Sequence, residues 1–193
     1  MKFASLCTAL AVAALAPSFA QAAADDSGFH PLVGAAITYG GDDIATVRFE
    51  SGGTRTIKAG GLLQIHAGAE YRVPDSPLSF LATIGYHVDN ITASNGSLRF
   101  DRFPIEAIVL WAPQPHLRLG VGARYAMSAH FSSSGDADIG SFDAKAEVGA
   151  LLMGEWRITP SQGVQVRYVH ETYKVFGESV DGSHFGVGYN YYF

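Results

Sequence analysis

The sequence contains almost no cysteine and, beyond its first residues, no long apolar run. Cys7 is the single cysteine among 193 residues, so disulfides and cysteine-ligated metal sites are excluded from the rest of the chain. No stretch of about 20 apolar residues follows residue 22, so the sequence predicts no transmembrane helix. Basic residues are not in excess either: 13 Lys and Arg stand against 18 Asp and Glu, which argues against a nucleic-acid partner.

Residues 1–22 have the features of a secretory signal peptide. Lys2 supplies the positive start, the run from Phe3 to Ala16 is apolar, and Ala20-Gln21-Ala22 forms a small-residue cleavage site. Without Lys2 the balance becomes 12 Lys and Arg against 18 Asp and Glu, a net charge of −6. We expect residues 25–193 to form one domain, because about 170 residues suit a single domain.

The remaining chain alternates apolar and polar residues with a period of two, which is typical of β-strands with two different faces. Alternation marks eight segments, each longer than the usual strand of about 5 or 6 residues. The predicted strands are residues 29–39, 60–72, 78–89, 98–111, 117–127, 142–157, 164–173 and 183–193.

The connections between these segments alternate between two kinds. Short turns, each with proline, lie at residues 73–77, 112–115 and 159–162. Longer polar connections lie at residues 90–97, 128–141 and 177–182, and residues 44–58 read as a small polar hairpin. Bacterial outer-membrane barrels have an even number of antiparallel strands, short periplasmic turns and longer outer loops. The sequence therefore predicts an all-β fold, an eight-stranded antiparallel up-and-down transmembrane β-barrel; a soluble β-sandwich is the alternative.

The last predicted strand carries a resemblance to a known family. Phe185, Val187, Tyr189, Tyr191 and Phe193 occupy every second position, with smaller or more polar residues between them. This ending resembles the C-terminal strand of small bacterial outer-membrane β-barrel proteins. The resemblance implies location in the cell outer membrane, contact with outer-membrane lipids and lipopolysaccharide, and recognition of this strand by the barrel-assembly machinery. We expect a monomer with both termini in the periplasm.

The phase of the alternation predicts which side chains face lipid. Leu98 and Phe100 are out of phase with Phe103 to Trp111, so we expect a bulge near Arg102 or Pro104.

Aromatic residues fall where interfacial girdles belong. They are Tyr71, Trp111, Trp156, Tyr191 and Phe193 at one rim, and Tyr39, Tyr86, Tyr125 and Phe142 at the other.

The opposite face collects charged residues of both signs. They are Glu70, Glu106, Glu147, Glu155, Glu171, Arg72, Arg118, Arg124, Lys145, Arg157 and Arg167. An eight-stranded barrel is wide enough only for side chains to fill it, and buried charges need partners. We therefore expect a plugged interior of ion pairs; a narrow charge-lined conduit is the alternative.

No residue is predicted to bind a metal or cofactor. His66, His87 and His184 are candidates for the inward face, but they lie on different predicted strands. The acidic stretch at residues 135–138 lacks the length and the glutamate of a dedicated calcium loop.

The preferred function is that of an integral outer-membrane barrel with a structural, surface-interaction or ligand-binding role and no catalytic residues. The alternative is a lipid A deacylase-like hydrolase that uses His170. In the deacylases, which this arrangement resembles, a His-x-Ser motif on strand 7 and a Glu on strand 8 form a lipid-facing triad. Here Thr172 stands in the place of the serine and Ser183 in that of the glutamate. The missing carboxylate leaves His170 without its orienting partner, so we predict no enzyme.

Overall fold

The computed structural model describes residues 28–48, 53–93, 96–135 and 140–193. The predicted signal peptide, the tip of the hairpin at residues 51–52 and most of the acidic stretch at 135–138 lie outside the described residues. The strands are β1 (Gly28–Gly40), β2 (Asp43–Arg48), β3 (Thr54–Lys58), β4 (Leu62–Arg72), β5 (Leu78–Ala93), β6 (Gly96–Gln114) and β7 (Leu117–Gly135). They continue with β8 (Phe142–Ala146), β9 (Gly149–Thr159), β10 (Gln162–His170), β11 (Thr172–Val175), β12 (Glu178–Asp181) and β13 (His184–Tyr192).

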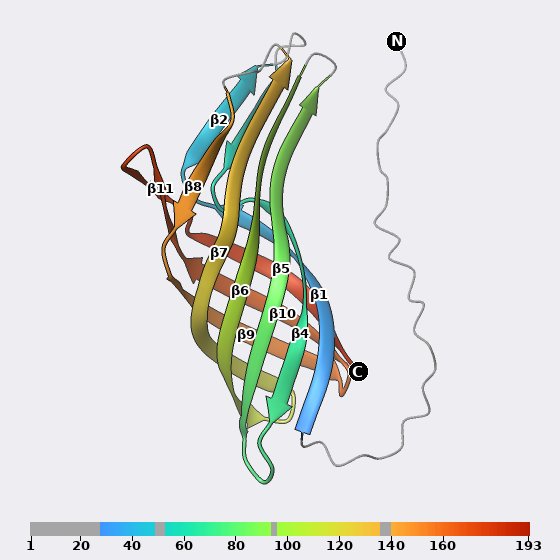
Figure 1. Cartoon of the computed structure of the whole chain (residues 1–193). Coiled ribbons are helices and arrows are strands. Elements are labelled where there is room, and N and C mark those ends of the chain that lie inside the picture. The colour runs from blue at the N-terminus through green and yellow to red at the C-terminus, as the bar shows by residue number, and fades with distance from the viewer. Residues whose placement is uncertain (1–27, 49–52, 94–95, 136–139) are drawn as a thin grey trace, which may run out of the picture.

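Eight of these strands close into an antiparallel barrel. Neighbours follow the order β7-β6-β5-β4-β1-β13-β10-β9, and a further pairing of β9 with β7 completes the circuit. Figure 1 shows these strands wrapping around a common interior. The predicted eight-stranded up-and-down barrel is confirmed. Within the described residues, no helix is long and apolar enough to cross a membrane.

Alternation places apolar side chains outside and polar ones inside. The exposed large apolar residues recur at every second position of the barrel strands, which is the arrangement that lipid favours. Examples are Val33, Ile37, Ile65, Phe80, Ile84, Val109, Val121, Leu152, Val166 and Val187. Buried residues at the intervening positions include Gln64, Glu106, Arg124, Glu155 and Asn190.

The C-terminal strand closes the barrel against the first. Strand β13 pairs with β1 on one side and β10 on the other, with Ala35 opposite Tyr189 and Val166 opposite Val187. The backbone N–H of Phe193 donates to the carbonyl of Pro31 at 2.9 Å. Both ends of the barrel chain therefore lie at the same rim.

At the other rim the sheet rises well beyond the barrel. Strands β5, β6 and β7 contain 16, 19 and 19 residues and continue upward together with β8 (Figure 1). The predicted loops at residues 90–97 and 128–141 are therefore largely wrong, because β5 reaches Ala93, β6 starts at Gly96 and β7 reaches Gly135. Ile91, Leu98 and Phe131 bury an apolar inner face there, which stabilises strands where Ser, Gly and Asn suggested loops.

Irregular residues mark the boundary between the barrel and this outer extension. The β6–β7 register shifts by one between Asp101 and Phe103, where Ser128 of β7 has a φ of +48°. The extra residue is on β7, so the bulge expected in β6 lies at the right height but on the partner strand. Leu98 and Phe100 simply continue the inward row of β6 above Arg102.

A second irregularity separates β8 from β9. Glu147 and Val148 are both exposed, so the alternation changes phase between them. Ala144 and Ala146 consequently point inward while Lys145 and Glu147 point outward. The prediction that Lys145 and Glu147 face inward is wrong, because one extra residue moves every side chain beyond it to the other face.

The predicted aromatic girdles are mostly on the outside. Tyr39, Trp111, Trp156 and Phe193 are exposed apolar surface. Phe142 is different: its ring stacks on Phe131 at 4.8 Å between centroids, inside the outer extension. Its assignment to a lipid girdle is wrong because it precedes the phase change in the β8–β9 segment.

Candidate functional site

The interior of the barrel nearest the termini is organised around Arg118. Its guanidinium forms ion pairs with Glu70 and Glu155, and Arg72 donates from Nε to Glu70 at 3.1 Å. The hydroxyl of Tyr192 donates to Glu155 at 2.8 Å, and the amide of Asn190 donates to the same carboxylate oxygen at 2.6 Å. This lower network joins side chains from β4, β7, β9 and β13 across the barrel axis.

A second network lies above it and is organised around Arg124. Nη1 of Arg124 donates to Glu106 at 2.7 Å and Nε donates to Glu171 at 2.9 Å. Arg167 contacts Glu106 at 2.7 Å, and Tyr173 donates its hydroxyl hydrogen to Glu171 at 2.9 Å. The charges named in both networks are paired across the barrel axis, which is the arrangement expected where side chains fill the narrow interior of an eight-stranded barrel.

The inward charges predicted on the barrel strands are confirmed. Apart from Lys145 and Glu147, the whole predicted set is buried: Glu70, Glu106, Glu155, Glu171, Arg72, Arg118, Arg124, Arg157 and Arg167. The sequence prediction missed Arg102, which is buried beneath Phe100 with its Cζ 4.8 Å from the ring centroid. Arg102 is four residues before Glu106, an even spacing that places both side chains on the same face of the strand. The bulge expected near Arg102 concealed this relationship.

Small residues make room for these long side chains. A Cβ atom added to Gly163 would lie 2.5 Å from the carboxyl carbon of Glu155, and one added to Gly68 would lie 2.0 Å from the backbone oxygen of Ala82. Gly163 therefore leaves space for a charged side chain, and Gly68 allows close approach of the neighbouring strand.

The three candidate inward histidines are buried but do not converge on one point. His66 hydrogen-bonds Asn190 at 2.8 Å, whereas His87 bonds Thr38 at 2.8 Å and Arg124 at 2.9 Å. His184 lies with its ring 5.2 Å from that of His87 and bonds the carbonyl of Gly182. Among the described residues, no three His, Cys, Asp or Glu side chains are grouped to hold a metal ion.

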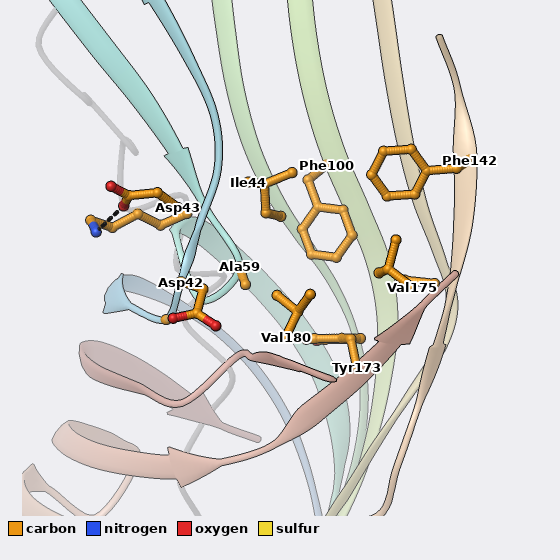
Figure 2. A pocket seen from close by; sticks show the side chains of 12 residues that line it. Asp42, Asp43, Ile44, Ala59, Phe100, Phe142, Tyr173, Val175 and Val180 are labelled. Carbon is orange, nitrogen blue, oxygen red and sulfur yellow. Dashed lines mark hydrogen bonds and ion pairs between the residues drawn. The ribbon is translucent and has the colours of Figure 1, made fainter. Parts of the chain in front are cut away.

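Above the polar interior, the outer extension surrounds a cavity of about 660 Å³. It lies between the β2–β3 hairpin on one side and strands β6, β8, β11 and β12 on the other (Figure 2). The apolar lining consists of Ile44, Ala59, Phe100, Phe142, Ala144, Val175 and Val180, with the ring of Tyr173. The predicted hairpin at residues 44–58 is confirmed, and it forms one wall of this outer cavity.

Packing behind the walls fixes the aromatic rings of the cavity. Phe100 and Tyr173 meet edge to face with centroids 5.5 Å apart, and Phe142 stacks on Phe131. These residues belong to a buried apolar cluster that also contains Ile57, Ile91 and Leu98. The cavity is therefore a preformed space within a small hydrophobic core that is separate from the barrel interior.

Charged groups lie at one edge of the cavity. Nζ of Lys58 contacts Asp43 at 2.5 Å, and this hydrogen bond raises the pKa of Lys58. Asp42 accepts the backbone N–H of Asp181 at 2.8 Å and donates its own N–H to the Asp181 carbonyl at 2.7 Å. Hydrogen bonds from the hydroxyl and the backbone N–H of Ser183 lower the pKa of the Asp181 carboxyl.

The His170 constellation lies on the outside near the top of β10. Nδ1 of His170 lies 2.9 Å from Oγ of Ser183, so Ser183 rather than Thr172 is its hydroxyl partner. Asp181, the carboxylate nearest to Ser183 in sequence, accepts the N–H of Ser183 at 2.9 Å. Among the described residues, no carboxylate forms a hydrogen bond with the imidazole of His170, and that is the group that orients the base in a catalytic triad.

A closed eight-stranded barrel with an apolar belt, a paired polar interior and an outward extension defines the class of outer-membrane β-barrels. The family model described as outer membrane protein beta-barrel domain matches residues 7–193, and the chain belongs to this family. It is an integral outer-membrane protein. No curated protein matches the chain.

Solved structures show the same fold at low sequence identity. Ail, the attachment invasion locus protein of Yersinia pestis, is 13% identical with a TM-score of 0.56; the match covers 86% of this chain and 99% of that chain. Neisserial surface protein A is 16% identical with a TM-score of 0.50, covering 86% and 98%. A structure of Ail in complex with the heparin analogue sucrose octasulfate gives 13% identity and a TM-score of 0.51, covering 86% and 97%.

Proposed function

We propose that the protein is a non-enzymatic binding protein of the outer membrane that acts through its outer extension. One contrast carries the proposal. The barrel interior is filled by ion-paired side chains centred on Arg118 and Arg124, whereas the extension holds a preformed cavity of about 660 Å³. A filled interior leaves no path for solutes, and a cavity of several hundred Å³ is typical of small-molecule sites.

The similar solved structures support a surface role. Ail is an attachment invasion protein and the Neisseria protein is a surface protein by name. The sulfated ligand of Ail does not suit this chain, because the net charge here is −5, Asp42 and Asp43 line the cavity, and Asp181 is hydrogen-bonded to Asp42. Sulfate groups would meet carboxylates there.

The environment of the protein is part of the same proposal. The exposed apolar belt contacts outer-membrane lipids and lipopolysaccharide, and β13 is the strand that the barrel-assembly machinery recognises. The protein functions as a monomer. Residues 1–22 are removed as a signal peptide. The folded barrel has both termini in the periplasm and the β2–β3 hairpin at the cell surface.

Cysteine labelling tests the orientation. The processed chain would contain no native thiol, so each introduced cysteine reports one position. Arg55→Cys in the exposed hairpin should react with a membrane-impermeant maleimide on intact cells, whereas Gln114→Cys beside a short turn should react only after permeabilisation. The reverse pattern would overturn the orientation.

The binding role is tested with cells producing the wild-type protein, a variant with residues 44–57 replaced by Asn-Gly, or no protein. Retention is measured on immobilised extracellular-matrix proteins and glycosaminoglycans, after heat-modifiable gel mobility has verified that the variant forms a barrel. We expect the wild type to be retained on at least one surface and the variant to be retained less. Equal retention of all three strains would contradict a surface-interaction role.

A further inference from the structure

We propose that the outer cavity binds a small amphipathic cation, an arylalkyl- or alkylammonium whose apolar group packs on Phe100, Phe142 and Val180 and whose ammonium pairs with Asp42. The inference rests on the proposed function, since it assigns a ligand class to the same outer extension. It follows from the shape of the walls and from which charges at the edge already have partners.

The walls accept an apolar group of limited size. Figure 2 shows the rings of Phe100 and Phe142 on the same side of the cavity, with Val180 and Tyr173 below them in this view. The hydroxyl of Tyr173 is used by Glu171 at 2.9 Å, beneath the cavity, so its ring offers apolar surface. Aromatic faces also attract cations, which favours an ammonium over a neutral group of the same size.

The charges at the edge decide the sign of the ligand. Lys58, the one cation among the described lining residues, is held by Asp43 at 2.5 Å and lies over the Tyr39 ring at 5.5 Å. Asp42 accepts a backbone N–H and, within the described residues, forms no ion pair. The backbone carbonyl of Asp181 accepts the N–H of Asp42, so a second carboxylate is near Asp42. Among the described residues, the Asp181 carboxylate also forms no ion pair, and it accepts the N–H of Ser183.

Asp42 is well placed to receive a cationic group. It is exposed and lines the cavity, and Figure 2 shows it beside Ala59 and Val180 at the lower edge. A ligand with its ring among the phenylalanines therefore has its polar end next to the carboxylate of Asp42, which accepts the backbone N–H of Asp181. An anionic ligand of the same shape would be repelled by Asp42 and Asp181 and would have to displace Asp43 from Lys58.

The test uses two probes of matched size and opposite charge, 4-phenylbutylamine and 4-phenylbutyrate. Binding is measured by calorimetry and by NMR shifts on the full barrel in nanodiscs of zwitterionic phosphocholine lipid, so that lipid charge does not select the cation. We expect the amine to bind at least tenfold more tightly than the carboxylate. Equal affinities, or preference for the carboxylate, would overturn the assignment of ligand charge.

Two variants locate the site, and a third serves as their control. Ala144→Phe places a ring in the cavity and should abolish amine binding, while Ala150→Phe on the lipid face of β9 should leave it unchanged. Asp42→Asn keeps an acceptor for the Asp181 N–H and should lower amine affinity about tenfold without changing the affinity for neutral 4-phenylbutanol. Amine binding that survives Ala144→Phe would overturn the site. Absence of amine binding to the wild type, with cell retention still dependent on the hairpin, would refute this inference but leave the surface role intact.

Discussion

Glu106 and Arg124 are direct partners across the β6–β7 pair, and their side chains form an ion pair of 2.7 Å inside the barrel. The same guanidinium reaches Glu171, between β10 and β11, at 2.9 Å, so one arginine neutralises two carboxylates from different parts of the barrel. Both partners of the 2.7 Å pair are buried. This relationship makes the interior a set of mutually dependent charges.

Arg124→Ala is expected to destabilise the barrel strongly. The substitution leaves Arg167 as the remaining arginine partner of Glu106 and removes from Glu171 its arginine partner. Breaking a buried pair by removing one partner costs about 3–5 kcal/mol. The measurement is the urea unfolding midpoint of the protein folded in lipid vesicles, followed by heat-modifiable gel mobility.

Glu147→Ala is the matched control. Glu147 faces outward, and the hydrogen bond to Thr172 is made by its backbone N–H, which alanine keeps. Its unfolding free energy should change by about 0.5 kcal/mol or less, as for other exposed substitutions. A large effect of Glu147→Ala with none of Arg124→Ala would mean that the charges in the interior are not the ones that stabilise it.

The contrast between these two residues shows what the sequence could and could not predict. Period-two alternation fixed the faces of Glu106, Arg124 and Glu155 because no extra residue interrupts their strands within the barrel. The phase of Lys145 and Glu147 depends on one extra residue next to Val148, and charged residues alternating with alanine look the same in either phase. The outer cavity was not predictable, because Phe100, Phe142 and Val180 come together only through the extended sheet.

Deletion of Phe193 is expected to lower the amount of barrel in the outer membrane severalfold. The residue carries the predicted assembly signal, and its N–H also bonds Pro31 at the seam between β13 and β1. Membrane fractionation with heat-modifiable mobility gives the amount. Phe185→Ala, which removes another exposed ring from the same strand, is the control and should have a smaller effect. Normal levels without Phe193 would count against the assembly role.

His170→Ala is expected to leave lipid A unchanged. His170 bonds Ser183 at 2.9 Å, but no carboxylate in the described part of the chain hydrogen-bonds its ring, so the pair there lacks the orienting group of a hydrolase. Mass spectrometry of lipid A from cells with the wild-type protein, the variant and no protein makes the comparison. Loss of a single 3-linked acyl chain that depends on His170 and Ser183 would establish the enzyme that we argue against.

The central claim is that the barrel is plugged and that its function lies in the outer extension. Conductance of the purified protein in planar lipid bilayers tests this most directly. The networks around Arg118 and Arg124 fill the interior, so we predict no sustained conductance above the bare membrane at any applied voltage. Large, sustained and voltage-insensitive channels would contradict the account, because they require an interior that the side chains do not close.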